Sequence, residues 1–231
     1  MMKSRNTWIV AMVLATATHA EIVQNDYWTK NQNLTNDNLG IRVVGGLIEG
    51  TSDEMNHFFH SSHTRVGHTD NYTGYDNVQQ VMTVFPECLW NDWTAGANEI
   101  YTYEAFLKAV AKFPYFCGET NSPLGYDLAQ TCKREIATFF ANSYVSSDGW
   151  QLTEGGPLGI SGNEYGEFSS VFYEGWDSSD ILTDDQDRVA EDGYVSLSAA
   201  MWKYMTTSLP SPSSHSIMTG FFEPNASDEQ A

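Results

Sequence analysis

The segment over residues 132–150 constrains the fold more than any other part of the chain. Aromatic, apolar and small side chains recur there at helical spacing, at Ile136, Phe139, Phe140, Ser143 and Tyr144. Spacings of three, four and seven to eight residues predict one buried face of a helix. Three charged residues, Lys133, Arg134 and Glu135, are expected on the solvent side of its first turn.

A polar turn follows this helix. Residues 146–149 read Ser-Ser-Asp-Gly, in which Ser and Asp compete for backbone hydrogen bonds and Gly loses conformational entropy when it is held in a helix. The helix is therefore expected to end here. A helix with one buried face that ends in a polar turn is a suitable position for an active-site group.

Two further segments have helical spacing. Thr102 is a suitable N-cap for a helix that Pro114 ends. The buried face of this helix is expected to contain Tyr103, Phe106, Leu107, Val110 and Phe113. A second helix is expected over residues 195–205, with Leu197, Ala200, Met201 and Tyr204 on its inner face.

The first twenty residues have the three parts of a secretory signal peptide. Lys3 and Arg5 form a basic start, residues 8–15 are apolar, and residues 18–20 form a small-residue cleavage site. We expect a secreted protein whose mature chain begins at Glu21, with an uncleaved signal anchor as the alternative. The apolar run is far shorter than the roughly 20 residues that cross a bilayer, so no membrane span is expected.

The chain is strongly acidic, with a formal net charge of −19. This charge argues against nucleic acid and anionic membranes as partners, because both attract basic surfaces. Residues 178–192 are the most acidic segment, but they lack EF-hand spacing, so a solvated loop is expected there in preference to a calcium site. The glycine-rich segment over residues 155–166 lacks the Gly-Lys-Ser/Thr ending of a phosphate-binding loop and is expected to be an exposed loop or short strand. No cofactor is expected.

Three cysteines are present: Cys88, Cys117 and Cys132. In an oxidising compartment this count predicts one disulfide and one remaining thiol. We expect the bond between Cys117 and Cys132, because it closes a loop of about 15 residues and stabilises the fold by ~3 kcal/mol in the chain-entropy model. The remaining Cys88 is either free or bonded to another chain.

Residues 21–84 are rich in Asn, Asp, Gly, Thr and His and are expected to form an irregular extension on a main domain over residues 85–231. The extension is expected to hold a short strand or two at most. Three Asn-x-Ser/Thr triplets, at Asn33, Asn71 and Asn225, are candidate N-glycosylation sites and agree with secretion.

Three histidines in the extension, His57, His60 and His63, are spaced three residues apart. Imidazoles at this spacing can bind zinc or copper. No cysteine lies near them, so solvated or packed histidines are the default interpretation and a metal site is the weaker one.

Four blocks of sequence resemble the glycoside hydrolase family 19 chitinases. The blocks, in chain order, are YTYEAFLKAVAKFPYFC (101–117), CKREIATFFA (132–141), GPLGISGNEYG (156–166), and SAAMWKYM (198–205) followed by residues 210–220. The third block is similar to the family motif GRGPxQLSxNxNYG, and the last to SPKPSxHxVxTG. The resemblance covers residues 85–231 and implies a mainly α-helical, two-lobed, lysozyme-like fold, here truncated, with a sugar cleft between the lobes.

The same resemblance implies chemistry that this chain has altered. The family hydrolyses β-1,4-linked N-acetylglucosamine (GlcNAc) polymers with inversion, which needs two carboxyl groups roughly 6.5–9.5 Å apart. Alignment places Ser146 at the general acid, and a hydroxyl cannot replace a carboxylic acid of tuned pKa. The segment that would hold the base is absent. Asp148, Glu154 and Glu164 are the candidate substitutes.

The eroded motif still implies a sugar-binding surface, formed by Ser161, Asn163, Glu164 and Tyr165. We therefore expect a secreted chitinase-like protein that binds chitin or another GlcNAc-containing glycan without hydrolysing it. Two alternatives remain. One is an active endochitinase with relocated carboxylates, and the other is an extracellular structural or assembly subunit joined through Cys88.

Overall fold

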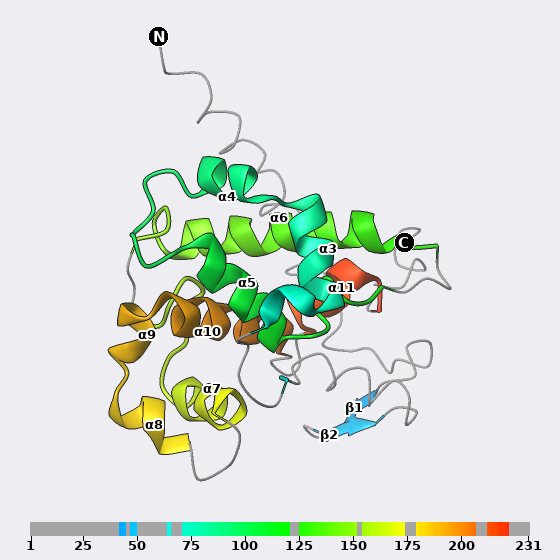
Figure 1. Cartoon of the computed structure of the whole chain (residues 1–231). Coiled ribbons are helices and arrows are strands. Elements are labelled where there is room, and N and C mark those ends of the chain that lie inside the picture. The colour runs from blue at the N-terminus through cyan, green and yellow to red at the C-terminus, as the bar shows by residue number, and fades with distance from the viewer. Residues whose placement is uncertain are drawn as a thin grey trace.

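The computed structural model describes residues 42–44, 47–49, 64–65, 71–120, 125–151, 154–173, 179–206 and 212–221. In this part the chain is mainly helical, which confirms the expected fold class (Figure 1). The helices are α3 (Asp76–Val84), α4 (Glu87–Trp93), α5 (Tyr103–Lys112), α6 (Leu128–Ser146), α7 (Glu164–Phe172), α8 (Ser179–Asp184), α9 (Arg188–Glu191), α10 (Gly193–Met205) and α11 (Ser214–Thr219). A 3-10 turn, η2 (Tyr72–Gly74), precedes α3.

The predicted signal peptide over residues 1–20 lies outside the described residues. So do the histidines His57, His60 and His63 and the glycosylation candidates Asn33 and Asn225. Asn71 is described and exposed at the start of η2, and its glycosylation stays a prediction.

A small antiparallel hairpin lies in the N-terminal region. Strands β1 (Arg42–Val44) and β2 (Leu47–Glu49) pair with Val43 opposite Ile48. This agrees with the expectation of a short strand or two. Further along, the Thr64 hydroxyl donates to the Val171 carbonyl over 2.8 Å, and the Arg65 amide donates to the Lys112 carbonyl over 2.8 Å. Residues 64–65 therefore pack on the helical domain.

Helix α10 is the centre of the packing. It contacts α5, α6, α7, α9 and α11, and Figure 1 shows α5 and α10 lying against each other below α6. Its first residue must be glycine, because a Cβ on Gly193 would lie 1.8 Å from the Ile100 carbonyl oxygen. The inner-face residues expected from the sequence, Leu197, Ala200, Met201 and Tyr204, are all buried, which confirms that prediction.

Polar caps fix the starts of the main helices. The Thr102 hydroxyl accepts from the Ala105 amide over 3.1 Å, as predicted for the start of α5. An Asp127 side-chain oxygen accepts from the Gln130 amide over 2.9 Å, so α6 begins at Leu128, before the segment that the sequence pattern marked. Ile136, Phe139, Phe140 and Ser143 are buried as expected, whereas Tyr144 is 37% exposed.

An aromatic cluster fills the space between α4, α5 and α6. Trp90 stacks on Phe106 with centroids 5.0 Å apart, and Phe140 lies 5.1 Å from Trp150 and 5.0 Å from Phe85. Such pairs add ~0.5–1.5 kcal/mol each beyond the area that they bury. Trp150 thereby fixes the end of the turn that follows α6 to the domain core.

Three helices lie where the sequence predicted irregular structure. Helix α3 falls in the expected extension, and its buried face consists of Val78, Val81 and Asn77, too few apolar side chains to show a period. The Asn77 amide nitrogen donates to the Val110 carbonyl in the last turn of α5 and to the Phe113 and Phe116 carbonyls in the segment that follows α5. The expected acidic loop at residues 178–192 contains α8 and α9 instead.

Two fully buried side chains, Leu182 and Val189, anchor α8 and α9 to the core. Within the described residues, no helix combines the length and the apolar character that a membrane span requires.

Candidate functional site

A disulfide joins α6 to the turn that follows α5. Cys117 and Cys132 are bonded, with their Cα atoms 4.5 Å apart, which confirms the predicted pairing. Cys117 has a left-handed backbone, with φ at +56°, and its amide points at α6. That amide donates to Glu135 Oε2 over 2.9 Å. The disulfide and this hydrogen bond together hold the turn against the first half of α6.

Glu135 is buried, contrary to the expectation that it lies on the solvent side of α6. Its exposed fraction is 0%, because α11 and the disulfide turn cover this side of the helix. A buried carboxylate without partners would be costly, so its two oxygens are satisfied separately. Oε2 accepts from Cys117, and Oε1 lies 2.6 Å from His215 Nδ1.

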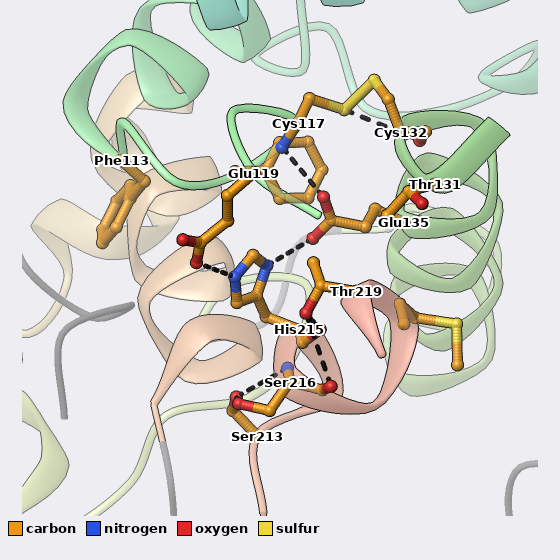
Figure 2. A network of polar contacts seen from close by, with 12 residues as sticks. Phe113, Cys117, Glu119, Thr131, Cys132, Glu135, Ser213, His215, Ser216 and Thr219 are labelled. Carbon is orange, nitrogen blue, oxygen red and sulfur yellow. Dashed lines mark hydrogen bonds and ion pairs between the residues drawn. A yellow bond between two sulfur atoms is a disulfide. The ribbon is translucent and has the colours of Figure 1, made fainter. Parts of the chain in front are cut away.

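His215 links two carboxylates (Figure 2). Its Nε2 lies 2.8 Å from Glu119 Oε1, while its Nδ1 contacts Glu135, so the imidazole lies between residues from two separate elements. His215 itself comes from α11, which Ser213 caps by accepting from the Ser216 amide over 3.0 Å. We call Glu119, His215 and Glu135 the buried triad.

The triad carries a charged imidazole. Burial lowers the pKa of His215, but the charge of Glu135, the hydrogen bonds that both carboxylates accept from the ring and the charge of Glu119 outweigh burial and raise this pKa to about 9. At neutral pH both ring nitrogens are therefore protonated and donate to the carboxylates. Ion pairs with such short contacts are charge-assisted hydrogen bonds, the stronger class.

Tyr204 of α10 belongs to the same polar region. Burial raises the pKa of its phenol well above the ordinary value, and the charge of Glu135 raises this pKa further. Its hydroxyl oxygen has no hydrogen-bond partner among the described residues. The region therefore combines a fully paired imidazole with one unsatisfied hydroxyl, and both of these groups are closed to solvent, whereas the Glu119 side chain is 18% exposed.

The polar turn that was expected to hold an active-site group follows α6. Ser147 closes it, since its hydroxyl donates to the Ser143 carbonyl over 2.6 Å and accepts from the Trp150 amide over 2.9 Å. Asp148 and Trp150 both have positive φ, at +49° and +65°, on either side of Gly149. Such conformations are costly for non-glycine residues and persist only where surrounding contacts enforce them.

Ser146, the residue aligned with the family's acid, is the last residue of α6 and is exposed. Asp148 and Glu154 are also exposed. Burial, and then the charges of Glu154 and Asp187, raise the pKa of the Tyr165 phenol, so Glu154 lies near Tyr165.

The glycine-rich segment is a loop at residues 155–163, and α7 begins at Glu164, within the segment up to residue 166 that was expected to be a loop or short strand. Ser161 and Asn163 are exposed on this loop, whereas Tyr165 is only 4% exposed and packs in the core. Glu164 is half-buried and forms an ion pair with Lys203 Nζ over 3.0 Å. The four predicted sugar-binding residues are thus neighbours, but two of them are turned toward the protein.

Sequence reasoning missed the triad. Glu119 lies within the loop that the predicted disulfide closes, and no role was assigned to it. Glu135 was expected on the solvent side, and His215 lies in a family-like block without an assigned role. One signal was available, because Glu135 lies three residues after Cys132 and therefore on the same helix face as the disulfide. Among the described residues, no group of three or more His, Cys, Asp or Glu side chains is arranged to hold a metal ion.

Comparison with known proteins gives consistent matches. Residues 156–231 match the family model described as Chitinase class I. Chitinase 12 of Oryza sativa subsp. japonica is 31% identical over 176 residues, which cover 61% of this chain and 52% of that protein. The acidic 27 kDa endochitinase of Solanum lycopersicum is 32% identical over 182 residues, which cover 67% of this chain and 70% of that protein. The inactive chitinase-like protein 2 of Hevea brasiliensis is 31% identical over 172 residues, which cover 61% of this chain and 48% of that protein. The chain spans about half the length of the rice and Hevea relatives.

Proposed function

The chain belongs to the chitinase class I family, glycoside hydrolase family 19, and we propose that it is a secreted member that binds chitin or another GlcNAc-containing glycan without hydrolysing it. It is a chitinase-like protein with the mainly helical, lysozyme-like fold of the family. The proposal concerns its ligand, its lack of turnover and its secretion.

The observation that carries the proposal is the chemistry at the end of α6. Ser146 stands at the aligned position of the general acid, and its hydroxyl cannot deliver a proton to a glycosidic oxygen near neutral pH. The neighbouring Ser147 hydroxyl is already engaged within the turn. Loss of a general acid typically costs about 10²–10⁴ in rate, and the aligned base-bearing segment is also missing.

Glu164 supports the same proposal. Of the three substitute carboxylates it lies within the family motif itself, but one of its oxygens is held by Lys203 and by the Ser161 amide. This oxygen is therefore already engaged by groups of the protein itself. Asp148 and Glu154 are both exposed.

Glycan binding is proposed for the exposed loop at residues 159–163. Ser161 and Asn163 present a hydroxyl and an amide there, both of which can donate to and accept from sugar hydroxyl groups. The glycines between and beside them leave the backbone open to close approach. This arrangement fits a polar polysaccharide better than an apolar ligand.

Sedimentation with insoluble chitin tests the binding. The wild-type protein is expected to pellet with chitin, and Asn163→Ala and Ser161→Ala are each expected to reduce the affinity about threefold to tenfold, the loss of one neutral hydrogen bond. Asn91→Ala is the matched control, because it removes an exposed amide from α4. A wild-type protein that stays entirely in the supernatant would overturn the proposal.

Two rival functions have distinct outcomes. An endochitinase with relocated carboxylates would release products from chitin, and Asp148→Asn or Glu154→Gln would abolish that release. An assembly subunit would form a covalent dimer through Cys88, which is exposed and unbonded on α4. That dimer would be visible on a non-reducing gel and absent in Cys88→Ser.

A further inference from the structure

We infer that Lys203 and Glu164 form a lock that holds the loop at residues 155–163 in its ligand-receiving shape, with Lys203 as a positioning residue. The inference rests on the proposed function for the role of the loop. The lock itself is defined by contacts that exist without any ligand.

The loop is first closed on itself. The Ile160 amide donates to the Gly155 carbonyl over 2.8 Å, and the Gly159 amide donates to the Gly156 carbonyl over 2.9 Å. A Cβ on Gly155 would lie 2.1 Å from the Ile160 carbonyl oxygen, so this tight closure requires glycine. The loop therefore has a defined backbone before any side chain acts on it.

Helix α10 then holds the loop at two points. The near point is Gly156, where a Cβ would lie 2.9 Å from the Ser196 carbonyl oxygen, so the loop backbone lies directly on the helix. The far point is Lys203, whose Nζ donates to the Gly159 carbonyl over 2.8 Å. Ser196 and Lys203 are seven residues apart, which places them on one face and roughly 10.5 Å apart along the helix axis.

Glu164, the first residue of α7, completes the lock by contacting both Lys203 and the loop. Its Oε2 accepts from Lys203 Nζ over 3.0 Å and from the Ser161 amide over 2.8 Å. The same oxygen lies 3.4 Å from the Ser161 hydroxyl. One carboxylate oxygen thus connects α10 to the residue that the proposed function places against the glycan.

The consequence for binding is preorganisation. Gly159, Ser161, Gly162 and Asn163 are all exposed along the locked loop. A loop that is already ordered loses less conformational entropy when a ligand binds, so affinity rises without any new contact. Lys203 and Glu164 have side chains only 33% and 28% exposed, and a partly exposed ion pair of this kind adds little to global stability. The effect of the lock is therefore local.

Amide hydrogen exchange of Ser161 tests the lock without a ligand. In Lys203→Met, the protection of the Ser161 amide is expected to fall about tenfold while core amides of α6 keep their rates, because only the local opening becomes easier. Lys203→Arg keeps the charge and the donors and is expected to restore most of the protection. Lys108→Met is the matched control, since Lys108 forms a similar ion pair with Glu104 on α5 at 34% exposure.

Glycan affinity tests the positioning role. Lys203→Met is expected to weaken the binding of chitin oligosaccharides about threefold to tenfold with little change in the melting temperature, as expected for lost preorganisation. Unchanged Ser161 exchange in Lys203→Met would overturn the lock. Normal affinity with an unprotected loop would overturn the positioning role. If the wild type binds no chitin while Lys203→Met loses Ser161 protection, the proposed function fails and the lock stands.

Discussion

His215 Nδ1 lies 2.6 Å from Glu135 Oε1, and both side chains are completely buried. The two residues are 80 positions apart in the sequence, so this contact joins α11 to α6 over a long chain separation. Glu119 and the Cys117 amide complete the group from the disulfide turn. Helix α11 is therefore held by charge-assisted hydrogen bonds, whereas α5 and α10 are held mainly by apolar packing.

Glu135→Gln is expected to destabilise the fold by up to about 3–5 kcal/mol, because it breaks a buried ion pair and leaves the buried His215 charge with Glu119 as its one ion-pair partner among the described residues. Equilibrium unfolding in urea measures this change. Glu104→Gln is the control, since Glu104 is 63% exposed and its pair with Lys108 on α5 is expected to contribute only ~0.3–0.5 kcal/mol. Equal effects of the two substitutions would show that the buried triad does not carry the stability assigned to it.

Stability is expected to fall as the pH rises from about 6.5 to about 9. His215 has a folded-state pKa of about 9 against an ordinary value of 6.5, so its contribution is complete below pH 6.5 and is lost as the pH rises through 9. At about 1.4 kcal/mol per unit, the contribution is on the order of 3 kcal/mol. Unfolding free energies across this range test it against His215→Gln, which should lack this component. If the unfolding free energies of the wild type and of His215→Gln change with pH in parallel, the prediction is wrong.

Reduction of the Cys117–Cys132 disulfide is expected to lower the unfolding free energy by ~3 kcal/mol, the value for a loop of about 15 residues. The reduced protein should also lose part of the pH dependence above, because the Cys117 amide would no longer be held against Glu135. Thermal melts with and without a reductant measure both effects. Cys88→Ser serves as the control and should melt like the wild type. A reductant effect that persists in the Cys117→Ser/Cys132→Ser double variant would contradict the assignment.

Tyr204→Phe is expected to leave stability unchanged or to raise it by about 1 kcal/mol. The phenol hydroxyl is buried without a partner among the described residues, and an unsatisfied buried polar group costs roughly 1–3 kcal/mol. Urea unfolding measures the change, and Tyr165→Phe is a matched substitution on α7. A loss of more than 1 kcal/mol would mean that the Tyr204 hydroxyl has a partner, such as a buried water molecule.

Local pattern predicted α5 and α10 well, because each carries an apolar face with several large side chains and the caps or breakers that bound it. It failed for α3, whose buried face contains an asparagine and only two valines. The Cys117–Cys132 bond followed from cysteine count and compartment. An element can therefore be predicted when its own side chains form a large apolar face, and it is missed when its burial depends on contacts with distant residues.

The candidate site was less predictable for a physical reason. Glu135 looks like a solvent residue when it is seen beside Lys133 and Arg134, and only His215 and the Cys117 turn explain its burial. Glu164, a candidate acid in the sequence, is paired with Lys203, which lies 39 residues later. Both contacts join residues that are far apart in the chain, so no local spacing in the sequence predicts them.

The central claim is binding without turnover, and one titration tests it most directly. A chitin oligosaccharide is titrated into the wild-type protein in a calorimeter, and the recovered ligand is then analysed by mass spectrometry. The expected result is a saturable binding heat, with the oligosaccharide recovered intact at every pH at which the protein is folded. Recovery of shorter GlcNAc oligomers that vanish with Asp148→Asn or Glu154→Gln would contradict it.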